Sequence, residues 1–144
     1  MKKRFVIHEH HASRLHFDLR LEIGGVLKSW AVPKGVSMNP ADKRLAVAVP
    51  DHSLGYIGFE GALAEGTYGA GEVRIWDKGE FAAENPEAQL QKGKLVFTFH
   101  GEKLKGEFTL LKFGKDEKNW LIIKAKDEFV DQNWKLETVL KPKK

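Results

Sequence analysis

The sequence has no cysteine among its 144 residues. Disulfide bonds, thiolate metal sites and cysteine-based zinc fingers are therefore excluded, and the chain suits the reducing cytoplasm in which we expect it to act. Long apolar runs are also missing, because the apolar residues 5–7 are followed at once by His8. No segment has the features of a signal peptide or the length of a membrane span, so we expect no membrane association.

The composition is that of a globular chain, which we expect to form a single domain over residues 1–144. Hydrophobic residues make up 42% of the chain and charged residues 31%, and this balance excludes an intrinsically disordered protein. The formal net charge of +4 favours a polyanionic partner. Basic residues at both termini contribute to that charge, and a solubilising role explains them equally well.

Short segments of strand character, separated by glycine, dominate the sequence. Residues 16–23 alternate strictly between polar and apolar side chains, and Gly24-Gly25 predicts a hairpin turn into a return strand over residues 26–32. Further strands are expected over residues 44–49, 56–59, 72–76, 94–100, 107–113 and 120–126, with a turn at 77–79 and a helix at 86–91. This pattern predicts an all-β fold: a compact antiparallel β-barrel, closed or nearly closed, with at most one or two short helices.

The aromatic residues and the glycine-rich passage are expected to serve this barrel. Four aromatic residues at strand spacing are predicted to lie in the core rather than to stack on bases: Trp30, Trp76, Phe97 and Trp120. Residues from about 129 onward lack clear alternation, so packing of Trp134 and Leu136 back on the barrel is left open, as is the role of Trp134. Residues 65–71 lack the Gly-Lys-Ser/Thr ending and the following helix of a phosphate-binding loop, so their glycines indicate bulges or tight barrel corners.

Four of the six histidines are concentrated near the N-terminus, beside a carboxylate and a guanidinium. Alternate residues of a strand share one face, so His16, Asp18 and Arg20 project from the same side, about 7 Å apart along the strand. Imidazole nitrogens and a carboxylate oxygen suit a divalent transition metal, with His10 or His11 as the third ligand. Arg20 would then offer a planar fork of donors to a phosphate beside the metal.

Each of these features also has a structural interpretation. Residues 16–22 fit the solvent-facing side of an amphipathic strand, although a ladder of His, Asp and Arg beside further histidines is unusual there. His52 and Tyr56 lie in a turn after a strand that ends at a proline, and such residues are more often semi-buried structural groups. Lys34 and Arg44, taken singly, are most often just solvated.

Five ordered motifs run through the sequence: FVIHEHHASRLHFDLRLE at 5–22, LKSWAVPKG at 27–35, Asp51-His52 with Tyr56, Phe59-Glu60-Gly61, and YGAG at 68–71 leading to Trp76-Asp77. Together they resemble the 3′-phosphoesterase domain of bacterial DNA ligase D. The resemblance spans about residues 5–127. It implies a compact barrel with a crescent-shaped active-site groove and a manganese-dependent hydrolase, with Co²⁺ or Zn²⁺ as alternative metals. Such enzymes remove a 3′-terminal ribonucleoside by phosphodiester cleavage and then remove the remaining 3′-phosphate.

The resemblance also implies a role for individual residues. The metal ligands are expected to be His10, His16 and Asp18. The scissile phosphate is expected to contact Arg20, His52 and Tyr56, and Lys34 and Arg44 match basic positions that support the phosphomonoesterase step. Pro50 departs from the family pattern, because many members have an acidic residue there.

The resemblance places the chain in DNA end repair by non-homologous end joining. The expected partners are nucleic acid 3′ ends, such as a primer–template with a 3′ ribonucleotide or a 3′-phosphate, and a DNA ligase or an end-binding protein. We expect a monomer. Two other classes stay open: a non-catalytic nucleic-acid-binding β-barrel, which predicts metal-independent and salt-sensitive binding, and a small-molecule oxygenase with non-haem iron, which has no need of Arg20, His52 or Tyr56.

Overall fold

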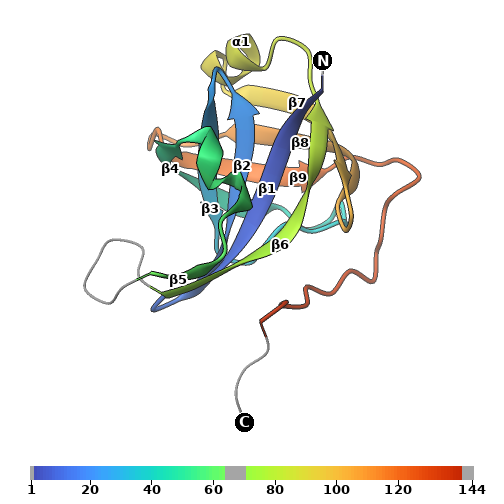
Figure 1. Cartoon of the computed structure of the whole chain (residues 1–144). Coiled ribbons are helices and arrows are strands. Elements are labelled where there is room, and N and C mark those ends of the chain that lie inside the picture. The colour runs from blue at the N-terminus through green and yellow to red at the C-terminus, as the bar shows by residue number, and fades with distance from the viewer. Residues whose placement is uncertain (1, 64–70, 141–144) are drawn as a thin grey trace.

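The computed structural model describes residues 2–63 and 71–140 (Figure 1). Within these ranges the strands are β1 Lys2–His11, β2 Leu15–Ile23, β3 Val26–Val32, β4 Arg44–His52, β5 Gly61–Leu63, β6 Gly71–Ala82, β7 Lys94–Gly101, β8 Lys105–Lys112 and β9 Asn119–Lys124. A 3₁₀ helix, η1 (Leu54–Gly58), and a short α-helix, α1 (Pro86–Gln91), complete the described elements. Neither helix combines the length and the apolar character needed to cross a membrane.

Eight of the strands close into an antiparallel barrel. They pair in the order β1-β2-β3-β4-β9-β8-β7-β6, and β6 pairs again with β1, so that Phe5 faces Leu21 on one side and Gly79 on the other. The three-residue strand β5 adds to the end of β6, outside the closed ring. The ring of eight strands therefore has no open sheet edge. This arrangement confirms the predicted all-β barrel with almost no helix.

The barrel interior is filled by the apolar faces of the strands. In β2 the alternate residues Phe17, Leu19, Leu21 and Ile23 are all buried, as the strict alternation predicts. The four aromatic residues expected in the core belong to the same cluster, and Trp134 and Leu136 pack against it from the C-terminal segment. The sequence pattern therefore identified the interior correctly.

Three expectations for local structure were wrong. Residues 56–59 form part of a 3₁₀ turn instead of a strand, because backbone hydrogen bonds join Tyr56 N to Ser53 O and Phe59 N to Tyr56 O. The chain does not turn at 77–79, since β6 continues to Ala82. β4 does not end at Pro50 but runs on to His52, and a shift in its register with β3 accommodates the proline.

Glycine explains why β6 continues where a turn is expected. Gly79 has φ +154° and pairs with both Phe5 and Gly101, and a Cβ at this position would lie 2.3 Å from the carbonyl oxygen of His100. Only glycine allows this close approach of two strands. The expectation for residues 65–71 lies outside the described residues, apart from Gly71, which shows the same kind of close approach to the backbone of His11.

The outer face of β1–β3 is covered by the segment of residues 52–63, which contains η1. Val6 and Leu27 lie outside the core cluster and are nevertheless buried, and η1 contacts β1 and β3. In Figure 1 this green segment crosses in front of β2 and β3. We call it the cover segment. Buried side chains, some apolar and some polar, therefore lie between the cover segment and the outer face of these strands, separate from the barrel core.

Candidate functional site

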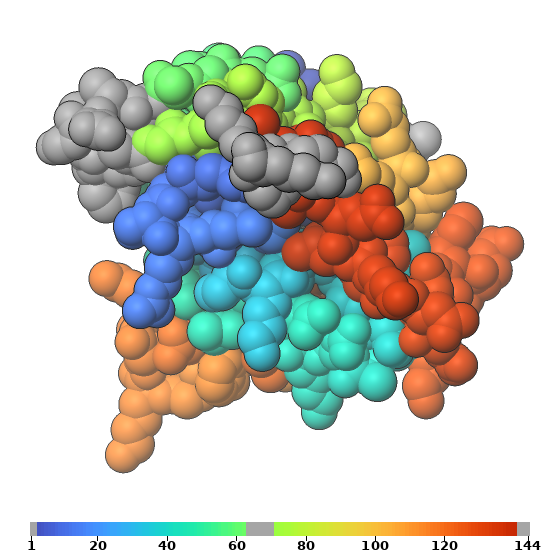
Figure 2. All heavy atoms as spheres, turned by 90° about the horizontal axis from the view of Figure 1, so that it is seen from below, coloured from blue at the N-terminus to red at the C-terminus, as the bar shows by residue number. Residues whose placement is uncertain are grey.

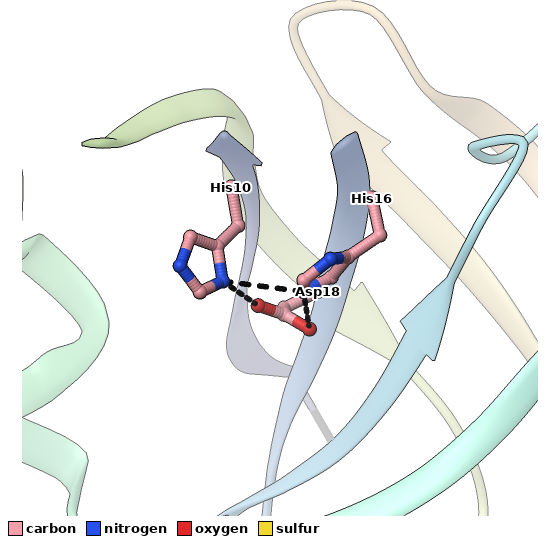
Figure 3. A group of neighbouring side chains, drawn as sticks. All are labelled: His10, His16 and Asp18. Atoms are coloured by element: carbon pink, nitrogen blue, oxygen red, sulfur yellow. Dashed lines mark hydrogen bonds and ion pairs between the residues drawn. The ribbon is translucent and has the colours of Figure 1, made fainter. Parts of the chain in front are cut away.

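Three potential metal ligands meet on the outer face of β1 and β2 (Figure 3). His10 on β1 pairs in register with His16 on β2, and Asp18 follows two residues later on the same face. His10 Nδ1 lies 3.2 Å from His16 Nε2 and 3.6 Å from Asp18 Oδ2, and His16 Nε2 lies 3.3 Å from Asp18 Oδ1. One ligand atom from each residue lies within 4.8 Å of the others. We call these residues the triad.

The orientation of His16 suits metal binding. Its Nδ1–H donates to the carbonyl oxygen of Arg14 at 3.1 Å, which turns Nε2 toward Asp18 and His10. A backbone carbonyl that holds the outer nitrogen of an imidazole is a common support of metal-ligating histidines. Two imidazole nitrogens and one carboxylate oxygen fit Mn²⁺, Co²⁺ or Zn²⁺ by donor type.

The charges of the triad are also poised for a cation. The hydrogen bond from His16 to Asp18 raises the pKa of His16 against the opposing effect of burial. Burial alone would raise the pKa of Asp18, but hydrogen bonds from His10 and His16, together with the charge of Arg20, hold it well below its ordinary range. Asp18 is therefore ionised at neutral pH, and a bound cation would take the place of the proton that His16 shares with it.

The neighbouring histidines on β1 have hydrogen-bond partners outside the triad. His11 lies on the other face of the strand and contacts Glu9 Oε2 through Nε2 at 2.6 Å. His8 Nδ1 accepts a hydrogen bond from Arg20 Nε at 3.1 Å, so its Nε2 carries the proton and donates to the carbonyl oxygen of Phe59, also at 3.1 Å. Of the two candidates for the third ligand, His10 and not His11 lies with His16 and Asp18.

His8 is neutral at physiological pH. Burial, followed by the charge of Arg20, lowers the pKa of His8 to about 4. A neutral imidazole can accept from the guanidinium and donate to the carbonyl oxygen of Phe59 at the same time. His8 therefore ties Arg20 to the cover segment.

Arg20 is buried and held on several sides. Its Nη1 donates to Ser29 Oγ at 2.9 Å, its Nη2 lies 3.4 Å from Asp18 Oδ2, and its guanidinium carbon lies 5.0 Å from the centre of the Tyr56 ring. The guanidinium therefore stands directly beside the triad, at a fixed position, as the spacing of residues on β2 predicts.

The cover segment brings an aromatic stack to the same place. The ring centres of His52 and Tyr56 are 4.5 Å apart with the ring planes 27° apart, and those of Tyr56 and Phe59 are 4.9 Å apart with the planes 10° apart. Burial and the charge of Arg20 lower the pKa of His52, and burial raises the pKa of Tyr56. At neutral pH the site therefore presents an uncharged imidazole and an un-ionised phenol.

The two remaining basic residues stand apart from this group. Lys34 is exposed in the turn after β3. Arg44 begins β4, and its Nη2 lies 3.5 Å from Asp42 Oδ2. Within the described residues, neither side chain has a hydrogen bond or ion pair with the triad, so their role in the reaction stays a prediction.

Sequence reasoning missed the residues that support Arg20, namely His8, Ser29 and Phe59. The available signal was the alternation of His8 and His10, which places both on one face once β1 is known to be a strand. Phe59 contributes a backbone carbonyl from 51 positions away, which no local pattern reveals.

Comparisons with known proteins identify the family of the chain. Residues 8–112 match the family described as DNA ligase D 3′-phosphoesterase domain. The chain is 50% identical over 128 residues to the multifunctional non-homologous end joining protein LigD of Pseudomonas aeruginosa, an alignment that covers 86% of this chain and 15% of that protein. It is 44% identical over 134 residues to LigD of Mycolicibacterium smegmatis (87% and 17%), and 43% identical over 124 residues to LigD of Mycobacterium tuberculosis (86% and 16%).

The chain thus spans between 15% and 17% of the length of these relatives. The family match covers most of the chain and includes all three triad residues. The chain belongs to the DNA ligase D 3′-phosphoesterase domain family.

Proposed function

We propose that this chain is a manganese-dependent phosphoesterase that processes the 3′ ends of nucleic acid strands during DNA end repair. It would remove a 3′-terminal ribonucleoside by phosphodiester cleavage and then hydrolyse the remaining 3′-phosphate. The observation that carries the proposal is the convergence of the triad within 4.8 Å beside the anchored guanidinium of Arg20. Family membership and the names of the relatives, which describe non-homologous end joining proteins, support DNA ends as the substrate.

The triad would hold the metal through His10 Nδ1, His16 Nε2 and the Asp18 carboxylate. Mn²⁺ is the proposed ion, and Co²⁺ or Zn²⁺ fits the same donors. When bound, the metal supplies Lewis-acid polarisation of a non-bridging phosphate oxygen. Arg14 O orients His16 for this task through the hydrogen bond to Nδ1.

Arg20 would neutralise the negative charge that develops on the phosphoryl oxygens. A donor that is already fixed before the reaction needs no reorganisation in the transition state. His8 and Ser29 provide this preorganisation, since each engages a different nitrogen of the guanidinium.

His52 and Tyr56 would act as hydrogen-bond donors to the phosphate. Because the pKa of His52 is lowered, its ring is uncharged at neutral pH, which favours hydrogen bonding in the transition state over full proton transfer as a general acid. Because the pKa of Tyr56 is raised, its hydroxyl keeps its proton and can donate it in a hydrogen bond. Lys34 and Arg44 are proposed to add positive charge for the phosphomonoesterase step.

The test is incubation of an end-labelled DNA strand carrying one 3′ ribonucleotide with the full chain and Mn²⁺, Co²⁺ or Zn²⁺. The expected products appear in order, first a strand ending in a 3′-phosphate and then one ending in a 3′-hydroxyl. His16→Ala and Asp18→Ala should lose both activities by at least about 10³-fold, because each removes a metal ligand. His100→Ala, at an exposed histidine on β7, is the matched control and should keep normal turnover.

Near-normal turnover of either triad variant would show that the metal assignment is wrong. Metal-independent and salt-sensitive binding without cleavage would instead identify a non-catalytic nucleic-acid-binding barrel.

A further inference from the structure

Glu9 is a buried carboxylate between His8 and His10, on the opposite face of β1 from the triad. It is fully buried, and three donors converge on it. Its Oε1 accepts from the backbone N–H of Val139 at 2.7 Å, and its Oε2 accepts from the N–H of Leu140 at 2.9 Å and contacts His11 Nε2 at 2.6 Å. A buried carboxylate needs such partners to offset its desolvation. Glu9 therefore binds the C-terminal segment to β1 across 130 positions of sequence.

The C-terminal segment, residues 129–140, is seated firmly at the end of the barrel. Trp134 and Leu136 pack on the core, and the ring centre of Trp134 lies 6.2 Å from that of Trp76. Trp76 Nε1 also donates to the carbonyl oxygen of Glu137 at 2.8 Å. Figure 2 shows the red C-terminal residues lying against the blue end of β1 and β2 and the cyan residues that follow β3. The segment is thus a packed part of the fold.

The turn after β3 is shaped to receive this segment. Gly35 has φ +76°, and a Cβ there would lie 2.8 Å from Leu136 Cδ2. The backbone N–H of Asp131 donates to the carbonyl oxygen of Met38 at 3.1 Å, which fixes the start of the segment on the same loop. The segment also lies outside residues 8–112, which the family match covers.

We propose that Glu9 is a positioning residue that uses the C-terminal segment as a clamp on the metal site. His10 follows Glu9 directly, and the ladder of β1 and β2 ends one pair later, at His11 and Leu15. His10 also pairs with Val73 of β6, but strand pairs that lie next to a loop open more readily than those in the middle of a sheet. The hydrogen bonds of Glu9 oppose this opening and hold His10 opposite His16. This inference rests on the proposed metal site and adds the clamp to it.

The variants must separate the clamp from general stability. Glu9→Gln keeps the size of the side chain but replaces one acceptor oxygen by an amide N–H₂ group. That group cannot accept a hydrogen bond from the N–H donors around it. Val139→Pro removes one of the backbone donors, at a side chain that is itself exposed. Val139→Ala keeps that donor and serves as the matched control. All variants are made in the full chain.

Two measurements are made on each variant. The first is the Kd for Mn²⁺ alone, by titration calorimetry. We expect it to rise about tenfold in Glu9→Gln and in Val139→Pro, the scale of losses caused by residues that orient metal ligands, and to stay within about twofold in Val139→Ala. The double variant Glu9→Gln/Val139→Pro should bind Mn²⁺ about as weakly as either single variant, because both substitutions disrupt the same contact between Glu9 and the C-terminal segment.

The second measurement is amide hydrogen exchange at His10 in the metal-free chain, with thermal unfolding as the reference for stability. Exchange at His10 should be faster in Glu9→Gln and Val139→Pro. The proposal is overturned if the Kd for Mn²⁺ stays at the parent value in these variants, whether or not the midpoint of unfolding falls. A parent chain that binds no Mn²⁺ contradicts the proposed function, whereas unchanged exchange at His10 contradicts the clamp alone.

Discussion

His8 is a buried imidazole whose two nitrogens are both engaged while it is neutral. Burial is the larger cause of the lowered pKa of His8, which is about 4. The second cause is Arg20, because protonation of His8 would place a positive charge and an N–H against the guanidinium. The unfolded chain keeps the ordinary value of about 6.5. Between these values only the unfolded state takes up the proton, so the stability contributed by neutral His8 is lost as the pH falls below 6.5.

We therefore expect the free energy of unfolding of the metal-free chain to fall by about 2–3 kcal/mol between pH 6.5 and pH 4. In His8→Gln most of this decrease should disappear, because glutamine can hydrogen-bond to the same neighbours and does not titrate. The measurement is urea unfolding at a series of pH values. The control His100→Gln, at an exposed position, should keep the parent pH dependence. An equally steep decrease in His8→Gln would contradict the burial of a neutral imidazole at this position.

At the scale of elements, β6 depends on a glycine to lie close to β7. Gly79→Ala would place a methyl group 2.3 Å from the carbonyl oxygen of His100 and keep φ at +154°. Both effects are unfavourable, so we expect a loss of about 2–4 kcal/mol in the free energy of unfolding. Chemical denaturation measures it. Gly55→Ala, in η1 where no neighbouring atom lies within 4 Å of the new methyl group, should change stability by less than about 0.5 kcal/mol. Equal effects of the two substitutions would contradict the strand pairing.

The elements that the sequence predicted each carry a signal that neighbouring residues show by themselves. β2 has an apolar face and a polar face, so its alternation is visible in the sequence. α1 has a proline in its first turn, which is a common signal for the start of a helix. β1 was absent from the predicted strands because both of its faces are buried, one in the barrel and one under the cover segment. The polar residues that interrupt its apolar run are site residues. The 3₁₀ turn of η1 was missed because its few residues carry no periodic pattern.

At the scale of the whole molecule, the part of the site that was predictable lies on one hairpin. His16, Asp18 and Arg20 share a strand face, and His10 lies opposite His16 across a short loop, so local rules together with the family resemblance were enough. The pairing of β1 with β6 and the contacts of Glu9 with the C-terminal segment join residues more than sixty positions apart. Such contacts depend on closure of the barrel, which local patterns do not encode.

Metal binding should stabilise the whole molecule, because the triad is assembled only in the folded chain. The two strands that carry it belong to the closed ring, so unfolding the ring separates the ligands. A ligand that binds only the folded state at a concentration of 100 times its Kd adds about 2.7 kcal/mol to the free energy of unfolding. We expect this increase with Mn²⁺ in the parent chain, measured by urea unfolding with and without the metal.

Asp18→Asn should abolish the stabilisation by Mn²⁺, since the amide is a poor ligand for the ion. Glu117→Gln makes the same chemical change at a side chain that is 88% exposed and should keep the full increase. If Mn²⁺ stabilised Asp18→Asn as much as the parent, the ion would be bound elsewhere on the surface and the triad would not be its site.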